Sequence, residues 1–277
     1  MTELAEVLQA FDEQTRRDLV WRAPGVEIQR VERDGVLRVV RFVSEPGQGW
    51  SAVIWSDLAD LDGAEVDAVI GEQAEFFAGR GATMEWKLYS HDLPSDLPER
   101  LARAGFTADP PEALVVAPVA DLAREVALPA GVTLVRVTDD TGLAQVRSVV
   151  EQAFPEDVDD LATNGFYDAL SVQLRETPEL LAVVVALAGE EPVSEGRIDF
   201  PPSGEFAGLW GGGTVPGWRG RGIYRALVAF RAALAAERGY RYLTVDASPD
   251  SRPILERLGF TVLSTTTPYL RRVPAER

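Results

Sequence analysis

The chain of 277 residues contains no cysteine, one histidine and two methionines. The absence of cysteine excludes disulfides and thiol catalysis. The single histidine, His91, cannot build a histidine-rich zinc site and has no cysteine to help it, so we expect no bound metal. Serine–histidine–aspartate hydrolysis would also require this one residue. We interpret His91 as an ordinary loop residue.

Long apolar runs are missing as well. The longest candidate, residues 180–188, is shorter than the roughly 18–20 residues of a membrane span and fits a buried strand. The first six residues are acidic and lack the basic segment of a secretory signal. We therefore expect a cytoplasmic protein that does not associate with membranes.

Basic residues are scarce relative to acidic ones. There are 27 lysines and arginines against 44 aspartates and glutamates, a formal net charge of −17. Such a surface repels nucleic acids and favours a cationic partner, for instance an amine. The acidity is equally explained by solubility alone. With 46% hydrophobic residues, the chain can bury a core of one large domain or two ordinary ones.

A faint internal repeat divides the chain. Residues 76–106 and 234–260 each predict a helix ending at Arg-Gly, a strand, a second helix and a Gly-Phe pair. The two glycines are 24 residues apart in the first copy and 20 in the second. With a linker near residues 128–131, we predict one unit over 1–125 and another over 131–277. Two unrelated units with common helix caps would give a similar pattern.

The second unit alternates strands with helices. Its pattern predicts an α/β layer fold with an antiparallel meander in its middle. The expected strands are 132–137, 180–188, 193–200, 205–215, 241–247 and 260–270, and the expected helices are 138–154, 166–175, 222–238 and 250–258.

The most informative stretch is Thr214 to Val228. A strand end is stopped by Pro216, a glycine-rich turn follows, and an amphipathic helix begins near Gly222. Glycines allow successive backbone N–H groups to point into one cavity, and the helix N-terminus adds its positive dipole end. Together with Arg219 and Arg221, this turn suits a diphosphate. It is neither a Walker loop nor Gly-x-Gly-x-x-Gly, and a purely structural turn is the alternative.

The segment Val-Pro-x-x-Arg-Gly-x-Gly-Ile at 215–223 resembles the coenzyme A pyrophosphate loop of the GNAT N-acetyltransferases. Gly259-Phe260 and the order of elements over 131–273 are similar too. The resemblance implies two tandem GNAT-like units, each a mixed, mainly antiparallel sheet flanked by helices. The first would be degenerate, because residues 57–63 replace the glycine loop with three carboxylates that repel a diphosphate. We expect one coenzyme A per chain, in the second unit.

The resemblance also assigns the cofactor residues. Pantetheine would pair with the strand end, the diphosphate would lie on the loop, and a serine would stand where the family often has asparagine. These residues are Thr214, Val215, Arg219, Gly220, Arg221, Gly222, Ile223, Tyr224 and Ser248. Tyr224 departs from the family's usual glycine or alanine, and Ser248 is equally a helix cap.

The catalytic residues are less clear. The family's usual tyrosine acid falls on Leu255, which cannot donate a proton, so Tyr224 and Ser251 are the possible substitutes. Candidate bases on the central strands are Glu195, Asp199 and Glu205, although strand carboxylates commonly face solvent. The backbone N–H near Val215 is expected to polarise the thioester carbonyl. Gly211 to Gly213 would open an acyl slot or serve packing, and the acidic segment 156–160 would attract a cation.

The sequence thus predicts an acyl-coenzyme A dependent N-acyltransferase, with acetyl-coenzyme A as donor and a small-molecule or peptide amine as acceptor, in a monomer or homodimer. The alternatives are a catalytically weak module that binds or senses coenzyme A, and a non-catalytic scaffold.

Overall fold

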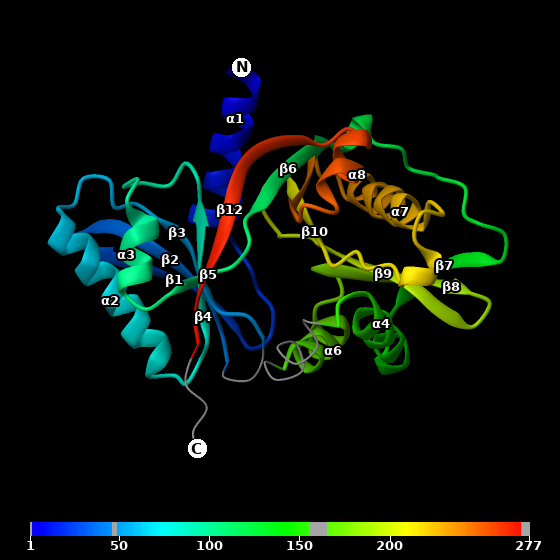
Figure 1. The fold of residues 1–277 in the computed structure, drawn as a ribbon, viewed down its shortest axis with the longest axis horizontal. Helices are drawn as coiled ribbons and strands as arrows, with labels where there is room; N and C mark the ends of the chain where they lie inside the picture. The colour runs from blue at the N-terminus through cyan, green and yellow to red at the C-terminus, as the bar shows by residue number, and fades with distance from the viewer. Residues whose placement is uncertain (1, 46–48, 156–164, 273–277) are drawn as a thin grey trace.

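The computed structural model describes residues 2–45, 49–155 and 165–272 (Figure 1). Two lobes stand side by side in it, the N-terminal half in blue and cyan and the C-terminal half in green to orange. The N-terminal half contains α1 (Thr2–Phe11), the π-helical turn η1 (Asp12–Arg17), β1 (Val26–Arg33), β2 (Val36–Ser44), β3 (Ala52–Ser56), α2 (Gly63–Ala78), β4 (Met84–Tyr89), α3 (Leu97–Arg103), β5 (Thr107–Ala108), β6 (Glu112–Pro118) and the 3-10 turn η2 (Val119–Asp121).

The C-terminal half follows a linker, residues 122–131, without helix or strand. Its elements are β7 (Val132–Val137), α4 (Asp140–Ala153), α6 (Phe166–Glu176), β8 (Leu181–Ala188), β9 (Glu191–Asp199), β10 (Phe206–Trp210), the 3-10 turn η3 (Pro216–Trp218), α7 (Ile223–Glu237), β11 (Tyr242–Ala247), α8 (Arg252–Arg257) and β12 (Thr261–Arg271). These confirm the predicted order of helices and strands. One prediction was wrong: the strand expected over 205–215 ends at Trp210, because Gly211 and Gly212 take positive φ angles of 63° and 102° that no strand accommodates.

All strands belong to one mixed, mainly antiparallel sheet flanked by helices, which confirms the predicted fold class. Its order is β1-β2-β3-β4-β12-β6-β11-β10-β9-β8-β7, and β5 pairs with β12 off this path. Parallel pairing occurs between β3 and β4 and between β10 and β11, in each case across a helix, α2 or α7. The two halves therefore repeat one strand–helix–strand unit.

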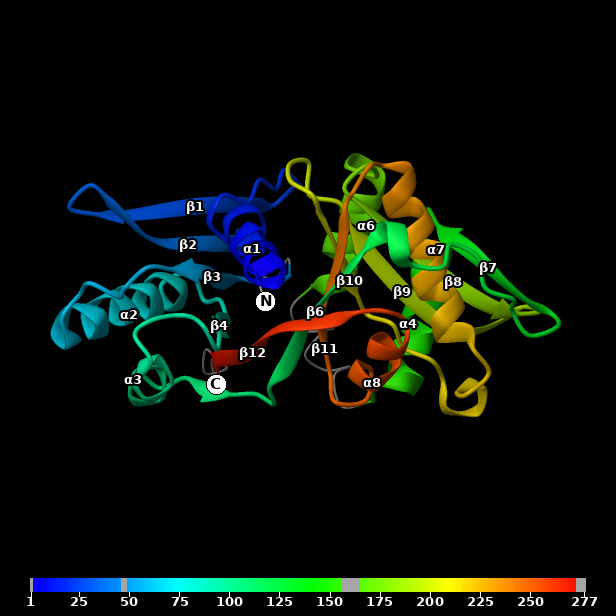
Figure 2. The same cartoon turned by 90° about the horizontal axis from the view of Figure 1, so that it is seen from above.

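The last strand of each half lies in the sheet of the other. β12 pairs antiparallel with β4 of the N-terminal half, and β6 pairs antiparallel with β11 of the C-terminal half. The two exchanged strands pair with each other between these neighbours. Figure 2 shows β12 in red and β6 in green crossing between the lobes.

The repeat is precise at its helix ends. Gly81 and Gly239 follow α2 and α7 with φ of 64° and 80°, and Gly105 and Gly259 follow α3 and α8 with φ of 87° and 105°. In each case the next residue donates its N–H five residues back, as in a Schellman cap. Left-handed caps are therefore present in both copies, at Gly81 and Gly239, where the Arg-Gly pairs predict them, and also at Gly105 and Gly259.

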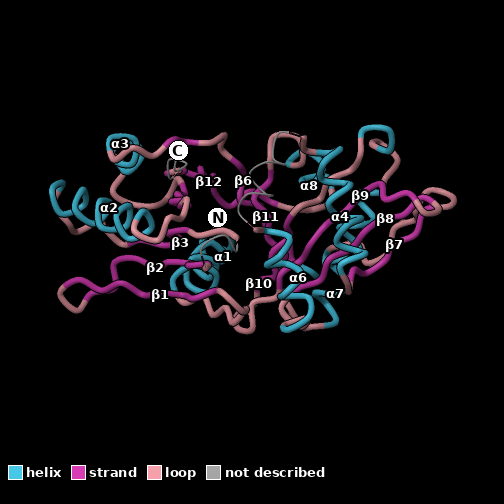
Figure 3. Tube along the Cα trace, turned by 90° about the horizontal axis from the view of Figure 1, so that it is seen from below, coloured by secondary structure: helices cyan, strands magenta, loops and turns pink. Residues whose placement is uncertain are grey.

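Helices cover both faces of the sheet in the C-terminal half (Figure 3). On one face, α7 packs through Val228, Ala232 and Ala235 on strands β9 to β11. On the other face, α4 and α6 pack on β7 and β8 through Val146, Leu170 and their neighbours. In the N-terminal half, α2 and α3 cover one face and α1 packs on the other near the exchanged strands. These helices bury their apolar faces on the sheet, and β10 and β11 lie near its middle, between β6 and β9.

Candidate functional site

A cavity of 1710 Å³ opens where the two central parallel strands separate. β10 and β11 are paired only from Phe206 to Gly208 and from Tyr242 to Thr244. Beyond this point the strands diverge, and Trp210 on one side and Asp246 on the other line the cavity. The two strands therefore splay apart at the cavity. Backbone groups left unpaired by the divergence are available to a ligand.

The N-terminus of α7 forms one wall of the cavity. Gly222 stands at the N-cap with φ 84° and no side chain caps the helix. The first intrahelical bond runs from Ala226 N–H to the Gly222 carbonyl, so the N–H groups of Ile223, Tyr224 and Arg225 have no helical acceptor. All three residues line the cavity, as does Gly220. An uncapped helix N-terminus directed at a cavity is suited to a phosphate group.

The corresponding helix of the first half is closed. Asp62 accepts hydrogen bonds from the N–H groups of Ala64 and Glu65, and the Glu65 carboxylate accepts one from Asp62 N–H. This capping box satisfies the donors at the start of α2 and adds negative charge there. The start of α2 is therefore capped by its own side chains, whereas the start of α7 has no side-chain cap.

The arginines of the loop differ in role. Arg219 folds back, donating to the Thr214 carbonyl at 2.9 Å and to the Ala153 carbonyl at 3.3 Å, so it fixes the loop against the end of α4. Arg221 lies over the Trp218 ring, 4.6 Å from its centroid. The sequence reasoning missed Arg225 and Arg257, which also line the cavity. The position of Arg225, three residues after Gly222 in the first helical turn, is the signal that could have found it.

Thr214 and Val215 are not equivalent. Val215 is buried and its N–H donates to the Val193 carbonyl at 3.0 Å, so this particular N–H is already engaged within the protein. Thr214 lines the cavity and pairs with Ser194 across an isolated bridge. The hydrogen bonds to β9 are made by the flanking residues, through the Gly213 carbonyl and the Val215 N–H. The N–H of Thr214 therefore points away from β9. Thr214 is thus the residue of the strand end that can pair with an extended ligand.

Ser248 lines the cavity at the end of β11. Its Oγ lies 3.2 Å from Ser251 Oγ and accepts from Ser251 N–H at 3.3 Å. Both roles considered from the sequence, ligand contact and helix cap, are therefore compatible with its position. Ser251 lines the cavity beside it.

The three glycines after Trp210 are required by close packing. A methyl group at Gly211 would lie 2.9 Å from the Glu195 carboxylate, one at Gly212 would lie 2.8 Å from the Tyr224 ring, and one at Gly213 would lie 2.7 Å from the Phe154 ring. All three also line the cavity. The packing and ligand-approach explanations therefore hold together.

Glu195 holds this glycine turn. Its Oε1 accepts from the N–H groups of Gly212 and Gly213, each at 3.2 Å, and the residue is 4% exposed. Burial raises the pKa of its carboxyl, while the two backbone bonds and nearby arginines oppose this. Glu195 does not line the cavity, so it acts here as a positioning residue.

Tyr224 lies between this turn and the helix N-terminus. Its ring contacts the position of Gly212, and the residue lines the cavity. Burial raises the pKa of the phenol, which keeps it protonated and able to donate at neutral pH. Among the three catalytic residues predicted from the sequence, Tyr224 is the one placed at the cavity.

The other two lie elsewhere. Asp199 forms an ion pair with Arg197 at 3.0 Å, and burial raises its pKa to about 6. Glu205 precedes β10 at the opposite end from the glycines, 3.4 Å from Arg241. Neither lines the cavity. The structure therefore does not bring Asp199 or Glu205 to the cavity, because the alternation of a strand pattern does not show which end of the strand lies where β10 and β11 separate.

Leu255 is fully buried, and its carbonyl accepts the Schellman bond from Phe260 N–H. Its counterpart Leu101 is likewise fully buried and accepts from Phe106 N–H. Both leucines are core residues, which explains why the position carries no acid here.

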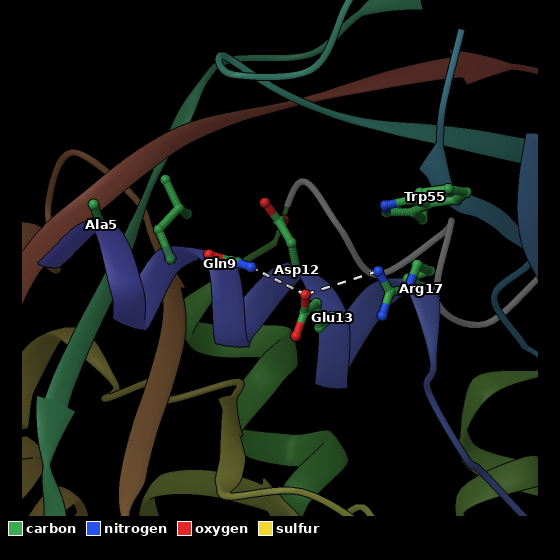
Figure 4. Close-up of a pocket in the computed structure, with 7 residues that line it drawn as sticks. Ala5, Gln9, Asp12, Glu13, Arg17 and Trp55 are labelled. Atoms are coloured by element: carbon green, nitrogen blue, oxygen red, sulfur yellow. Dashed lines mark hydrogen bonds and ion pairs between the residues drawn. The ribbon is translucent and has the colours of Figure 1, made fainter. Parts of the chain in front are cut away.

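The acidic segment 156–160 lies outside the described residues. Within the described ranges, no group of three or more potential metal ligands is present, and no helix has the length and apolar character to cross a membrane. A second, smaller hollow of 350 Å³ lies along α1 and η1 beside Trp55 (Figure 4). Its Glu13 is engaged with Gln9 and Arg17, so we find no ligand site there.

Comparison with known proteins agrees with this geometry. Residues 143–260 match the sequence model of the acetyltransferase (GNAT) family. No curated protein matches the chain in sequence. Among solved structures, a GCN5-related N-acetyltransferase from Kribbella flavida is similar with TM-score 0.64 and 19% identity, covering 99% of this chain and 95% of its own.

Two other structures show the same arrangement. A GCN5-related N-acetyltransferase from Sphaerobacter thermophilus has TM-score 0.63 and 16% identity, over 87% of this chain and 78% of its own. A tandem GNAT protein from the clavulanic acid biosynthesis pathway has TM-score 0.60 and 14% identity, over 93% of this chain and 86% of its own. At these identities the structural likeness establishes the fold.

Proposed function

We propose that the chain is a GNAT-type acetyltransferase that transfers an acetyl group from acetyl-coenzyme A to an amine by direct attack. The match of residues 143–260 to the acetyltransferase (GNAT) family model supports this proposal. The observation that carries the proposal is the uncapped N-terminus of α7, which faces a cavity formed where β10 and β11 separate. The volume of 1710 Å³ exceeds that of an ordinary small-molecule pocket and suits a large donor together with an acceptor.

In this proposal the diphosphate lies on the N–H groups of Ile223 to Arg225, with Arg221 and Arg225 adding charge. The pantetheine arm pairs with Thr214 and passes between the diverging strands. The neutral amine attacks the thioester carbonyl, and Tyr224 is the nearest acid for the departing thiolate. We place one coenzyme A on each chain, because the start of α2 is closed by its own carboxylates.

The test is a calorimetric titration of acetyl-coenzyme A into the protein and into Gly222→Trp. Gly222 has φ 84°, so a side chain there strains the turn and reorients the N–H groups. We expect saturation near one per chain, and a loss of affinity of at least about tenfold in the variant. The matched control is Gly217→Ala, where a methyl group meets open space. Equal affinity of all three proteins would disprove the loop assignment.

A module that binds coenzyme A without turnover is the second candidate, because the buried Leu255 stands where the family usually has an acid. Release of free thiol from acetyl-coenzyme A in the presence of amines separates the two. The absence of cysteine from the chain removes any thiol background from that assay.

A further inference from the structure

The floor of the cavity is built by the N-terminal half. The loop Asp109 to Pro111 and Glu112, the first residue of the exchanged strand β6, line it together with residues of β10, β11 and the α7 loop. Because β6 pairs with β11 on one side and β12 on the other, Glu112 is held next to the end of β11. A residue of the degenerate half therefore reaches the proposed reaction site.

Charged groups of one face of the sheet gather at this floor. Asp246 is opposite Leu114, and Glu112 is two residues from Leu114, so both carboxylates face the same side. Lys87 of β4 pairs with Asp246 at 2.5 Å and lies 5.5 Å from the centroid of the Trp210 ring. The cavity thus has arginines near the start of α7 and carboxylates where β6 pairs with β11.

Two carboxylates at this floor, those of Asp246 and Glu112, lack a full set of partners. The Asp246 side chain is 10% exposed, and while its Oδ2 takes Lys87, its Oδ1 is buried without a hydrogen bond. Among the described contacts, the Glu112 carboxylate makes neither a hydrogen bond nor an ion pair. A buried oxygen without a donor lowers stability unless a ligand supplies the donor. An ammonium group supplies N–H donors of the right charge.

We propose, on the basis of the acetyl-transfer function above, that Glu112 is the base that deprotonates the acceptor, with Asp246 Oδ1 holding the ammonium before transfer. The groups that face Glu112 are Asp246 on β11, Glu85 and Lys87 on β4, and Asp109 in the preceding loop. Burial, reinforced by Asp246 and opposed by Lys87, raises the pKa of Glu112 to about 7. A carboxyl with this pKa accepts a proton near neutral pH.

One proton of R–NH3+ passes to the Glu112 carboxylate, and the amine lone pair forms the N–C bond with the thioester carbon. The C–S bond then breaks. The attacking nitrogen, which is positively charged after attack, loses a second proton, and this proton reaches the thiolate sulfur through Tyr224 or water. The products are the amide, coenzyme A thiol and protonated Glu112, which returns its proton to solvent.

The first test compares acceptors that differ in protonation. Thiol release from acetyl-coenzyme A is followed with benzylamine, which is protonated at pH 7, and with hydroxylamine, which is neutral. In Glu112→Gln we expect a loss of about 100-fold with benzylamine, a change below about threefold with hydroxylamine, and unaltered affinity for acetyl-coenzyme A. The wild-type kcat/KM for benzylamine should increase with pH, with an apparent pKa near 7. This increase should be absent from the pH profile of Glu112→Gln. The matched control, Glu191→Gln on the exposed start of β9, should behave as wild type.

The second test needs no acceptor. Carbon NMR of protein labelled at the glutamate side-chain carboxyls, with the Glu112 signal identified by its loss in Glu112→Gln, should give a titration midpoint near 7. A midpoint below about 5 overturns the assignment. Equal loss with both acceptors, or full benzylamine turnover in Glu112→Gln, also overturns it while leaving acetyl transfer intact. Wild-type protein that binds acetyl-coenzyme A yet releases no thiol with either amine contradicts both proposals together.

Discussion

Lys87 Nζ lies 2.5 Å from Asp246 Oδ2, and this ion pair joins a strand of the N-terminal half to the central strand of the C-terminal half. Both side chains are nearly buried, at 12% and 10% exposure. The pair sits beside Trp210 at the floor of the cavity, so it contributes both to the contact between the halves and to the charge of the proposed acceptor site.

Replacing Lys87 with methionine leaves the Asp246 carboxylate buried and unpaired. We expect a loss of about 3–5 kcal/mol in the free energy of unfolding, measured by urea denaturation. The double variant Lys87→Met/Asp246→Leu removes both charges and should recover most of that loss. A single variant as stable as the wild type would show that water reaches Asp246 freely.

The stability of the protein should depend on pH through Glu112. Its pKa is raised from 4.5 to about 7 in the folded state, chiefly by burial. Between these values the folded state binds more protons than the unfolded state, so stability falls as the pH rises through this window. Glu112→Gln removes this dependence. It should gain roughly 1–3 kcal/mol relative to wild type between pH 4 and pH 8, the partial exposure of the carboxylate reducing the full effect.

Removing the capping box at the N-terminus of α2 tests how much this cap contributes to stability. Asp62→Ala removes the acceptor of two backbone N–H groups, and we expect a loss of about 1 kcal/mol in stability. Glu75→Ala, an exposed change within the same helix, serves as the control and should have little effect. Equal values for the two would mean that the cap contributes nothing to folding.

Gly212→Ala should disturb the site through Tyr224. The added methyl would lie 2.8 Å from the tyrosine ring, at a residue whose φ is 102°. We expect a stability loss of about 1–3 kcal/mol and weaker binding of acetyl-coenzyme A in calorimetry. The double variant Gly212→Ala/Tyr224→Ala, which removes the ring, should restore part of the stability. If the double variant recovers no stability, the loss comes from strain of the backbone at residue 212 and not from contact with the tyrosine ring.

Much of this arrangement follows from local sequence. The glycine turn before α7, the helix and strand order, and the left-handed cap at Gly239 depend on neighbouring residues, and the structure has them where the pattern placed them. The early end of β10 was missed because three glycines are compatible with a strand in sequence. Gly211 and Gly212 take positive φ angles, and the side chains that pack against the three glycines, Glu195, Tyr224 and Phe154, come from other elements.

The exchange of β6 and β12 between the two halves could not be predicted in the same way. β6 and β12 have the alternation of strands that complete their own halves, and nothing local distinguishes that pairing from the observed exchange. The position of Glu112 at the cavity depends on this pairing between distant segments. Arg219 was expected on the ligand, but its hydrogen bonds to Thr214 and Ala153 required knowledge of where α4 ends.

Separating the halves tests the exchange directly. Residues 1–125 and 126–277, expressed apart, should each lack the strand that closes their sheet and should show little cooperative unfolding by circular dichroism. Expressed together, they should assemble into a one-to-one complex that unfolds cooperatively, as measured by gel filtration and thermal melting. Independent, monomeric folding of either fragment would contradict this expectation.

The crossing of β6 and β12 also bears on how the chain has been preserved. It has the topology of a dimer of identical subunits that traded their last strands and were then joined end to end. In such a molecule, a copy that has lost its own ligand loop cannot be discarded, because its final strand is an interior part of the other copy's sheet. β6 is therefore constrained twice, as an interior strand of the second copy's sheet and as a border of the cavity.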